Sequence, residues 1–419
     1  MTQKKWFTLH SWAGFHLSLL LFFVLMTGTF ATISTDLDWL TNSAIQAKNN
    51  TPKEQSIDWP KLLDSVNQHF PNDKIQSIHR PAMPWHNVEV ILRDNNNERF
   101  RIYLDAYDYN ITGQGAWLNW QRFFRQTHRH LMLPTQLGIT IVGFLGLAML
   151  LLFITSFYIY RHWWKHFFAF SRIKTSFNLS QKLTTSTTLR KEAGTKRRFW
   201  AELHKLIGLW SLWLMLIISL TGTWYLAEKW GAGARYPTID NSSAMTTLTD
   251  DTSFSPIALA KAVKYISNTH PNYIINEIRF EADEKTIEID GQEYAVLVRD
   301  RANKKVFNRF SGEYIDGYQG DQLNWHLRIS EAADPLHFGT FSHWIYRYVW
   351  FVFGLALSFL SFSGIYMYFL RLRQTGELKN LEDKHSLYVL WLKTHWIKWP
   401  CSMLLLVWSY LVIHDFIII

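Results

Sequence analysis

Two long apolar segments of this chain each begin with a histidine. The first opens with LHSWAG and the second, about half the sequence later, with LHKLIG. An ionisable ring inside a membrane bundle is costly, so its presence indicates a function such as cofactor ligation, metal binding or proton transfer. At about 100° per residue, each histidine shares one helical stripe with two glycines. This predicts an imidazole that faces a gap wide enough for a flat group, although glycines also let helices pack closely. The stripes consist of His10, Gly14 and Gly28, and of His204, Gly208 and Gly222.

A second group of histidines lies at the other end of the apolar segments. The motif THRHL holds His128 and His130, and the motif PLHFG holds His337. His128 and His130 are two residues apart, about 200° around a helix, so only one of them can point into a bundle. We therefore expect two pairs across the bundle. They are His10 with His204 near the inner membrane face, and His128 or His130 with His337 near the outer face.

Paired histidines allow several kinds of chemistry. Zinc or copper binds imidazole, but each pair lacks the nearby Cys, Asp or Glu that would complete four ligands. A proton relay would use buried carboxylates, which the first four apolar segments lack. Bis-histidine ligation of haem needs two facing imidazoles, a flat apolar slot and cations for the propionates. An ordinary interfacial histidine with a satisfied hydrogen bond is the alternative at each position. The available cations are Arg122, Arg125, Arg129 and Arg347 at the outer end, and Lys4, Lys5, Arg197 and Arg198 at the inner end.

The apolar residues that would carry these histidines are gathered into blocks. The chain has 419 residues, 21 of them Trp, and a formal net charge of +9. A membrane-spanning helix needs about 20 apolar residues; four blocks reach that length and a fifth is shorter. The first block is longer than a typical signal-peptide core and no small-x-small site closes it, so we expect a retained helix. The blocks are Ala13–Ile33, Leu137–Tyr160, Ile207–Leu226, Tyr348–Leu370 and Met403–Ile419.

Basic residues predict the orientation of these spans. The loop between the second and third spans is rich in Lys and Arg and contains only two acidic residues, Glu192 and Glu202. Cytoplasmic loops carry such an excess, so we expect this loop and the N-terminus in the cytoplasm. The long polar segments Ser34–Gln126 and Ala227–Asp334 would then lie outside, in a bacterial periplasm.

The two halves of the chain resemble each other, which we interpret as an internal duplication. Each half would be helix, outside domain, helix, and the halves would be related by an axis along the membrane normal. An offset of 194 residues aligns His10, Gly14 and Thr27-Gly28-Thr29 with His204, Gly208 and Thr221-Gly222-Thr223, and an offset of 208 aligns Gly146-Leu147-Ala148, Tyr158 and Tyr160 with Gly354-Leu355-Ala356, Tyr366 and Tyr368.

Each outside segment has the pattern of a small α+β domain. A predicted helix, near Asp58–His69 in the first and Pro256–Thr269 in the second, precedes runs whose alternation is typical of half-buried strands. The runs are IQSIHR, NVEVILR and RFRIYLD in the first segment, and YIINEIRF, KTIEID and EYAVLVRD in the second.

The single cysteine, Cys401, limits the cofactor. It rules out C-x-x-C-H haem attachment, a cysteine-held iron–sulfur cluster and disulfides within the chain. A haem bound here must be non-covalent and of b type. The sequence also lacks nucleotide-binding and nucleophile-elbow motifs, so we expect no direct reaction with a nicotinamide.

The motifs together resemble the PepSY-associated transmembrane helix family. The resemblance rests on LHSWAG...TGTF...DLDWL, LHKLIG...TGTW, HRHL and DPLHFGTF, and it covers nearly all of Lys4–Arg373. Members include iron-regulated inner-membrane proteins and dihaem ferric-siderophore reductases. The resemblance implies two b haems that pass electrons across the inner membrane to a ferric siderophore in the periplasm. It also implies a membrane lipid environment, an unidentified electron donor and no nucleic-acid partner.

The family's histidines can be carried over to this sequence residue by residue. They fall on His10, His204 and His337 as iron ligands, and the His-Arg-x-Leu pattern selects His128, whereas the repeat alignment favours His130. The expected fold is an α-helical membrane bundle with a two-fold internal repeat and two small α+β PepSY-like extracytoplasmic domains, and the C-terminal apolar run adds a fifth helix that the family pattern lacks. We expect transmembrane helices at 1–33, 127–161, 204–226, 335–371 and 399–419, periplasmic domains at 34–126 and 227–334, and cytoplasmic segments at 162–203 and 372–398.

The chain departs from this family pattern in two places, and two other functions stay open. His16 is an extra histidine on a different face of the first span, and a further apolar run follows Arg373. A siderophore or metal permease without haem would need broken helices or polar residues near the bilayer midplane, and we expect neither in the first four spans. A membrane-anchored regulatory protein would leave the repeated His-Gly stripe unexplained.

Overall fold

The computed structural model describes residues 2–48, 57–168, 175–176, 189–239, 254–280, 285–341 and 343–375, and the single residues 399, 403 and 406. The chain divides into two compact units, each described by itself. The helical unit consists of Met1–Thr32, Phe124–Gly231 and Arg347–Ile419, and the sheet unit of Ile33–Phe123 and Ala232–Tyr346. Nearly all of the predicted fifth span lies outside the described residues.

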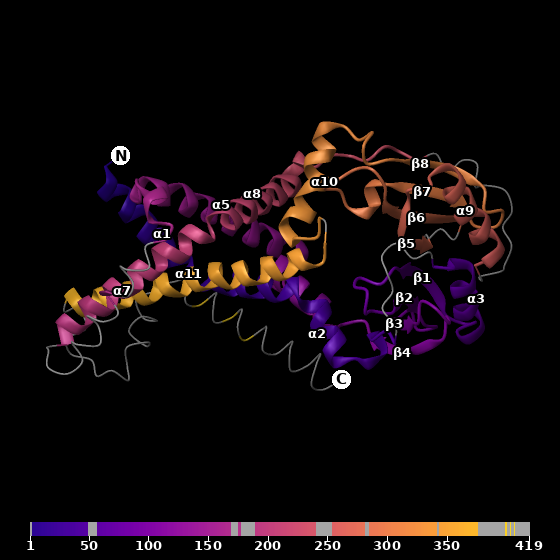
Figure 1. Ribbon diagram of the computed structural model, residues 1–419, viewed down its shortest axis with the longest axis horizontal. Coiled ribbons are helices and arrows are strands. Elements are labelled where there is room, and N and C mark those ends of the chain that lie inside the picture. Colours follow the sequence, from indigo (N-terminus) through magenta and orange to yellow (C-terminus); the bar gives the residue numbers. More distant parts are fainter. Residues whose placement is uncertain are drawn as a thin grey trace. The chain divides into compact units, whose positions relative to one another are not determined.

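Long apolar helices form the helical unit (Figure 1). Within the described ranges, three helical segments are long and apolar enough to cross a membrane: Gln3–Thr32, Thr135–Ile159 and Ile345–Leu372. A bent pair, Gly194–Trp210 with Leu212–Ala232, makes a fourth if it counts as one span. The helices are α1 (Gln3–Thr32), α4 (Trp120–His130), α5 (Thr135–Ile159), α7 (Leu189–Trp210), α8 (Leu212–Ala227) and α11 (Ile345–Thr375), with short turns η2 (Trp163–His166) and η3 (Glu228–Ala232).

The bend in the third span contradicts the expectation of unbroken helices. The two parts of the pair meet at 66° at Ser211. The Ser211 hydroxyl is fully buried and donates to the Ile207 carbonyl at 2.7 Å, a contact that tends to bend helices. The backbone N–H groups of Ser211 and Met215 still bond to the carbonyls four residues back, each at 2.9 Å. The chain therefore turns here while these main-chain bonds persist.

Small residues let the helices of this unit approach closely. A Cβ added to Gly146 on α5 would lie 3.0 Å from the Gly222 carbonyl carbon on α8. A Cβ added to Gly354 on α11 would lie 2.6 Å from the Thr29 hydroxyl oxygen on α1. These glycines therefore allow the helices to pack closely. For Gly222 this is the packing role given above as the alternative to a gap for a flat group.

The sheet unit contains one antiparallel sheet to which both halves of the chain contribute. Its strand order is β4-β3-β2-β1-β5-β6-β7-β8 (Figure 1). The expectation of two small domains is corrected, because β1 pairs with β5 across the halves. The elements are α2 (Ser34–Thr41), η1 (Ser43–Ile45), α3 (Trp59–His69), β1 (Lys74–His79), β2 (Val88–Arg93), β3 (Arg99–Leu104), β4 (Ile111–Ala116), α9 (Pro256–Thr269), β5 (Ile274–Phe280), β6 (Thr286–Gln292), η5 (Asp300–Ala302), β7 (Lys304–Asn308), β8 (Tyr314–Tyr318) and α10 (Trp325–Phe338).

The seam between β1 and β5 explains why the halves join. Ile78 pairs with Ile278, and both are fully buried in the core that α3 and α9 complete. Each half alone would expose these strands as an open edge with unpaired backbone groups. Pairing satisfies those groups and merges the two apolar faces into one core. The runs IQSIHR, NVEVILR, RFRIYLD, YIINEIRF and KTIEID all contribute to strands.

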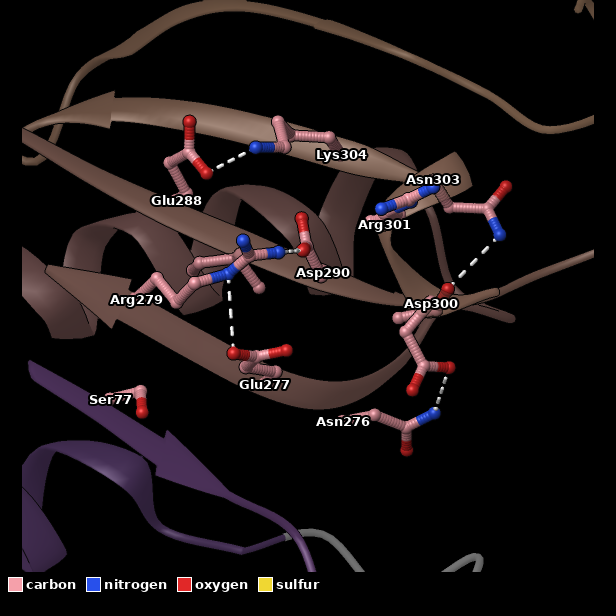
Figure 2. A network of polar contacts seen from close by, with 12 residues as sticks. Ser77, Asn276, Glu277, Arg279, Glu288, Asp290, Asp300, Arg301, Asn303 and Lys304 are labelled. Carbon is pink, nitrogen blue, oxygen red and sulfur yellow. Dashed lines mark hydrogen bonds and ion pairs between the residues drawn. The ribbon is translucent and has the colours of Figure 1, made fainter. Parts of the chain in front are cut away.

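The face of the sheet opposite the apolar core is polar. Neighbouring residues of a strand point to opposite sides, so the same strands supply both faces. Figure 2 shows this face over β5 to β7, where Arg279 bonds to both Glu277 and the fully buried Asp290. Lys304 bonds to Glu288 on the same face. Charge pairs thus cover this face of the sheet, whereas the other face is apolar.

The predicted strand EYAVLVRD is wrong. Its residues form a loop that enters η5, with Leu297 at a φ of 55°. Val298 is buried in a small cluster with Ala302, Leu323 and Leu327, away from the main core. Its apolar residues therefore pack a loop against α10, and the third strand of this half is β7 instead.

Candidate functional site

The inner pair of predicted histidines occupies equivalent environments in the helical unit. The Nδ1 atom of His10 on α1 lies 2.8 Å from the Thr155 hydroxyl oxygen on α5. The Nδ1 atom of His204 on α7 lies 2.7 Å from the Ser363 hydroxyl oxygen on α11. Thr155 and Ser363 are themselves 208 residues apart, the offset that aligned the second and fourth spans. Each ring is thus held by one hydroxyl from a neighbouring span.

The hydrogen-bond network assigns the tautomer of both rings. The Thr155 hydroxyl lies 2.9 Å from the Leu151 carbonyl and 3.0 Å from the Leu152 carbonyl, to which it donates its hydrogen. The Ser363 hydroxyl donates to the Leu360 carbonyl at 3.1 Å. Because each hydroxyl hydrogen has a backbone carbonyl in reach, we infer that each oxygen accepts from Nδ1–H of its histidine. The Nε2 atoms of both rings then carry the lone pair, which is the form that binds a metal.

The surroundings of the two histidines match as well. One helical turn before each histidine, a tryptophan packs on a tyrosine of the neighbouring span. The pairs are Trp6 with Tyr158, at a centroid distance of 4.4 Å, and Trp200 with Tyr366, at 4.9 Å.

The glycines one turn after these histidines are not required by the protein's own packing. A Cβ added to Gly14 would lie 3.9 Å from Leu152, and a Cβ added to Gly208 would lie 3.7 Å from Leu360. Both are ordinary van der Waals distances. Each of the two positions therefore admits a Cβ, which would lie in van der Waals contact with the neighbouring span.

His128 lies on α4 in a tight contact with α1. Its Nδ1 atom donates to the Val24 carbonyl at 2.9 Å. A Cβ added to Gly28 would lie 2.6 Å from the ring's Cε1 atom, so only glycine allows the imidazole to lie there. His130 instead bonds through Nδ1 to the Leu133 carbonyl at 3.0 Å, within the turn that joins α4 to α5. The two histidines of THRHL thus have distinct local roles.

Replacing Gly28 by alanine is expected to displace the His128 ring and destabilise the protein by about 1 to 3 kcal/mol, the usual cost of overpacking. Thermal unfolding of the detergent-solubilised chain measures this. The control is Gly364→Ala on α11, where an added Cβ meets no described heavy atom within 4 Å. Equal midpoints for the two variants would contradict the steric role of Gly28.

The remaining predicted site residues lie at three different places. His337 is in the last turn of α10, which ends at Gly339 in the left-handed conformation, and it belongs to the sheet unit. Arg129 is exposed on α4 in the helical unit. Arg347 donates from Nε to the Thr32 carbonyl at 2.9 Å and so links the start of α11 to the end of α1. His128 and His130 precede α5, and His337 precedes α11, each on a helix separate from the span that was expected to contain it.

Asp38 is a buried carboxylate that the search for chemical motifs missed. It accepts from the Asn119 side chain at 2.8 Å and from the backbone N–H groups of Trp120 and Gln121 at 2.7 and 3.1 Å. It therefore fixes the start of α4, the helix that carries His128. Burial raises the pKa of this carboxyl to about 6, against the lowering effect of the two amides. Its position within the DLDWL motif was the available signal.

The raised pKa of Asp38 predicts a pH dependence of stability. Its folded-state pKa of about 6 exceeds the ordinary 3.8, so the folded protein binds this proton more tightly than the unfolded chain. The contribution of Asp38 to stability is therefore largest below about pH 4 and falls by at most about 3 kcal/mol as the pH rises through 6. We expect the difference between wild type and Asp38→Asn in thermal midpoint to change across this window and to be flat above pH 7. Parallel curves from pH 4 to 7 would contradict this assignment.

A second buried carboxylate, Glu331, anchors α10. It is fully buried and bonds to Arg299 at 2.6 Å, to Arg301 at 3.4 Å and to the Tyr236 hydroxyl. Burial and the bond to Glu331 raise the pKa of Tyr236. Asp334, one turn on, also bonds to Arg299 at 2.9 Å. The helix that carries His337 is thus fixed by a charged network.

The described residues contain no group of three or more His, Cys, Asp or Glu side chains that could hold a metal ion. The inner histidines each bond through Nδ1 to one hydroxyl of a neighbouring helix. This donor set suits a cofactor that brings its own equatorial ligands, as haem does.

The fold and the comparison with known families agree on the class of protein. Apolar helices long enough to span a bilayer, joined to a mixed α and β unit, define a membrane protein. The family model described as the PepSY-associated TM region matches residues 7–371, so the chain belongs to this family. No curated protein matches the sequence.

Proposed function

We propose that this protein is an inner-membrane reductase that uses two non-covalent b haems to reduce ferric siderophores. The observation that carries the proposal is the inner pair of His10 and His204. Both rings bond through Nδ1 to hydroxyls at equivalent positions. Two imidazoles between membrane helices, whose Nε2 atoms carry lone pairs, form a suitable donor set for bis-histidine ligation.

At the inner site, His10 and His204 would hold the iron from opposite sides. Gly14 and Gly208 lie one turn after them, and the lack of a side chain at both positions would let a planar group approach the helix backbone. Lys4, Lys5 and the nearby arginines of α7 are cations suited to propionates. When bound, haem supplies reversible one-electron transfer, and the protein positions it and excludes water.

For the outer haem, His128 of the helical unit is the proposed ligand, and His337, which belongs to the sheet unit, is carried over from the family pattern alone. His128 is favoured over His130 because its ring packs closely against Gly28 of α1, whereas His130 closes a local turn. Arg129 is exposed on the same helix and is available to a propionate. Arg347 would serve the same role from the start of α11.

The proposed reaction moves one electron at a time across the membrane. A cytoplasmic or membrane donor gives an electron at the inner site, and a ferric complex accepts it at the outer site to become ferrous. Siderophores hold Fe³⁺ through hard oxygen donors, so reduction weakens the complex. The basic loop predicts a cytoplasmic N-terminus, and the sheet unit would then lie in the periplasm and dock the ferric complex.

The absorption spectrum of the detergent-purified protein, oxidised and then reduced with dithionite, tests this function. A pyridine haemochrome assay of haem-replete preparations should give about two b haems per chain. A ferric siderophore added to the reduced protein should reoxidise it. A colourless protein from haem-replete cells would overturn the proposal.

A permease is the second candidate, because the third span is bent by 66° at Ser211. Broken helices often line the substrate sites of transporters. This candidate predicts uptake of a ferric siderophore or metal into proteoliposomes by protein that contains no haem. Uptake that continues after His10→Ala and His204→Ala would favour it over the reductase.

A further inference from the structure

We propose that Thr155 and Ser363 are positioning residues that set the tautomer, orientation and donor strength of His10 and His204. The haem-dependent part of this proposal rests on the proposed function. The tautomer itself is a property of the chain alone. Neither hydroxyl was singled out by the sequence motifs.

The argument begins with the direction of the hydrogen bonds. In each case a backbone carbonyl accepts from the hydroxyl, and the hydroxyl oxygen accepts from the histidine. The relay therefore runs from ring to hydroxyl to main chain. Reversing it would turn the hydroxyl hydrogen from its carbonyl to the ring, so the carbonyls of α5 and α11 favour the Nδ1–H form.

Burial makes the hydroxyls difficult to replace. Thr155 and Ser363 are both fully buried. If either hydroxyl is removed, water has no ready access to accept from Nδ1–H. The ring must then keep an unsatisfied donor in an apolar setting, rotate, or change tautomer, which moves the proton to the nitrogen needed for ligation.

The consequence for a bound iron follows from ligand basicity. An acceptor on the distal N–H increases the donor strength of the ligating nitrogen, which favours the oxidised metal. Loss of the acceptor should therefore raise the reduction potential of the inner site and weaken retention of its cofactor. Loss of such outer contacts typically costs about 10- to 100-fold in metal affinity.

The first experiment needs no cofactor. ¹⁵N chemical shifts of selectively labelled histidines in haem-free, full-length protein report the protonated nitrogen, with His10→Gln and His204→Gln used for assignment. We expect the Nδ1–H form for both rings in the wild type. Thr155→Val should change the tautomer ratio of His10 alone, and Ser363→Ala that of His204 alone. An Nε2–H form in the wild type, or unchanged ratios in both variants, would overturn the proposal.

The second experiment uses the loaded protein. Potentiometric titration should show a higher potential for one of the two haems in Thr155→Val and in Ser363→Ala, with faster loss of haem to apomyoglobin. Thr155→Ser and Ser363→Thr keep the hydroxyl and should restore wild-type values. Ser156→Ala and Ser358→Ala are matched controls, since these hydroxyls also bond to carbonyls of the same helices, Phe153 and Gly354, at 2.6 and 3.0 Å.

The outcomes separate the two proposals. A wild-type protein without haem would remove the proposed function and leave the tautomer result intact. Two haems with potentials and haem loss unchanged in both hydroxyl variants would retain the function and reject Thr155 and Ser363 as positioning residues. Equal shifts of the potential and of haem loss in the control variants would assign the effect to general helix packing. That outcome would also reject Thr155 and Ser363 as positioning residues.

Discussion

His10→Ala and His204→Ala are each expected to lower the haem content from about two per chain to about one. Each change removes one of the two axial ligands that we propose for the inner site, and the remaining ring has no neighbouring side chain of comparable donor strength in its described surroundings. The haemochrome assay measures the content, and the reduced spectrum should lose one of its two components. Electron transfer from the inner side should fall with it.

The matched control is His16→Ala. This histidine lies on the same helix as His10 and packs against Trp12 and Phe15 at centroid distances of 5.0 and 5.3 Å. It should retain about two haems. Full haem content in both His10→Ala and His204→Ala would contradict the inner-site assignment, and so would equal losses in all three variants.

Glu331→Ala should produce the largest loss of stability in the sheet unit. Removing the fully buried carboxylate deprives Arg299 and Arg301 of their shared partner and leaves the Tyr236 hydroxyl without its acceptor. Breaking a buried ion pair from one side costs about 3 to 5 kcal/mol. Because Arg299 is partly exposed and keeps Asp334, we expect about 3 kcal/mol, or a fall of about 6 to 12 °C in thermal midpoint.

Thermal unfolding of the full chain, followed by tryptophan fluorescence and far-ultraviolet circular dichroism, measures this effect. Lys61→Ala is the control, because its ion pair with Asp58 is exposed and such pairs contribute little. Its midpoint should match the wild type. An equally unperturbed midpoint in Glu331→Ala would show that the network around α10 is dispensable.

Local patterns explain why parts of the fold could be predicted. The helices near Asp58 and Pro256 begin where expected, because Asp58 and Ser255 cap the first turn and a proline follows each. Five of the six predicted strand runs contribute to strands because their alternation matches a half-buried sheet. EYAVLVRD has a similar composition but packs as a loop, which depends on its contacts with α10 and has no local signal.

The candidate site was likewise predictable only where it depends on local patterns. The spacing of histidines and glycines is a local property, and it indicated His10 and His204 as partners. Residue spacing did not predict that His128 packs against another helix while His130 bonds within a local turn. The packing of His128 depends on Gly28, a residue 100 positions away in the chain. Glu331 was missed because it lies in no motif, and Asp38 was missed because the DLDWL motif does not show which donors the carboxylate bonds to.

The sequence by itself determined the apolar spans, the paired histidines and the capped helices, because each depends on residues within a few turns of one another. The tertiary structure decided the rest. It bonded the His10 ring to Thr155 and the His204 ring to Ser363, across 145 and 159 residues. It also joined the two halves into one sheet and bent the third span at Ser211. These features arise from buried hydrogen bonds and strand edges that must be satisfied by distant partners, and no local pattern specifies which partners those are.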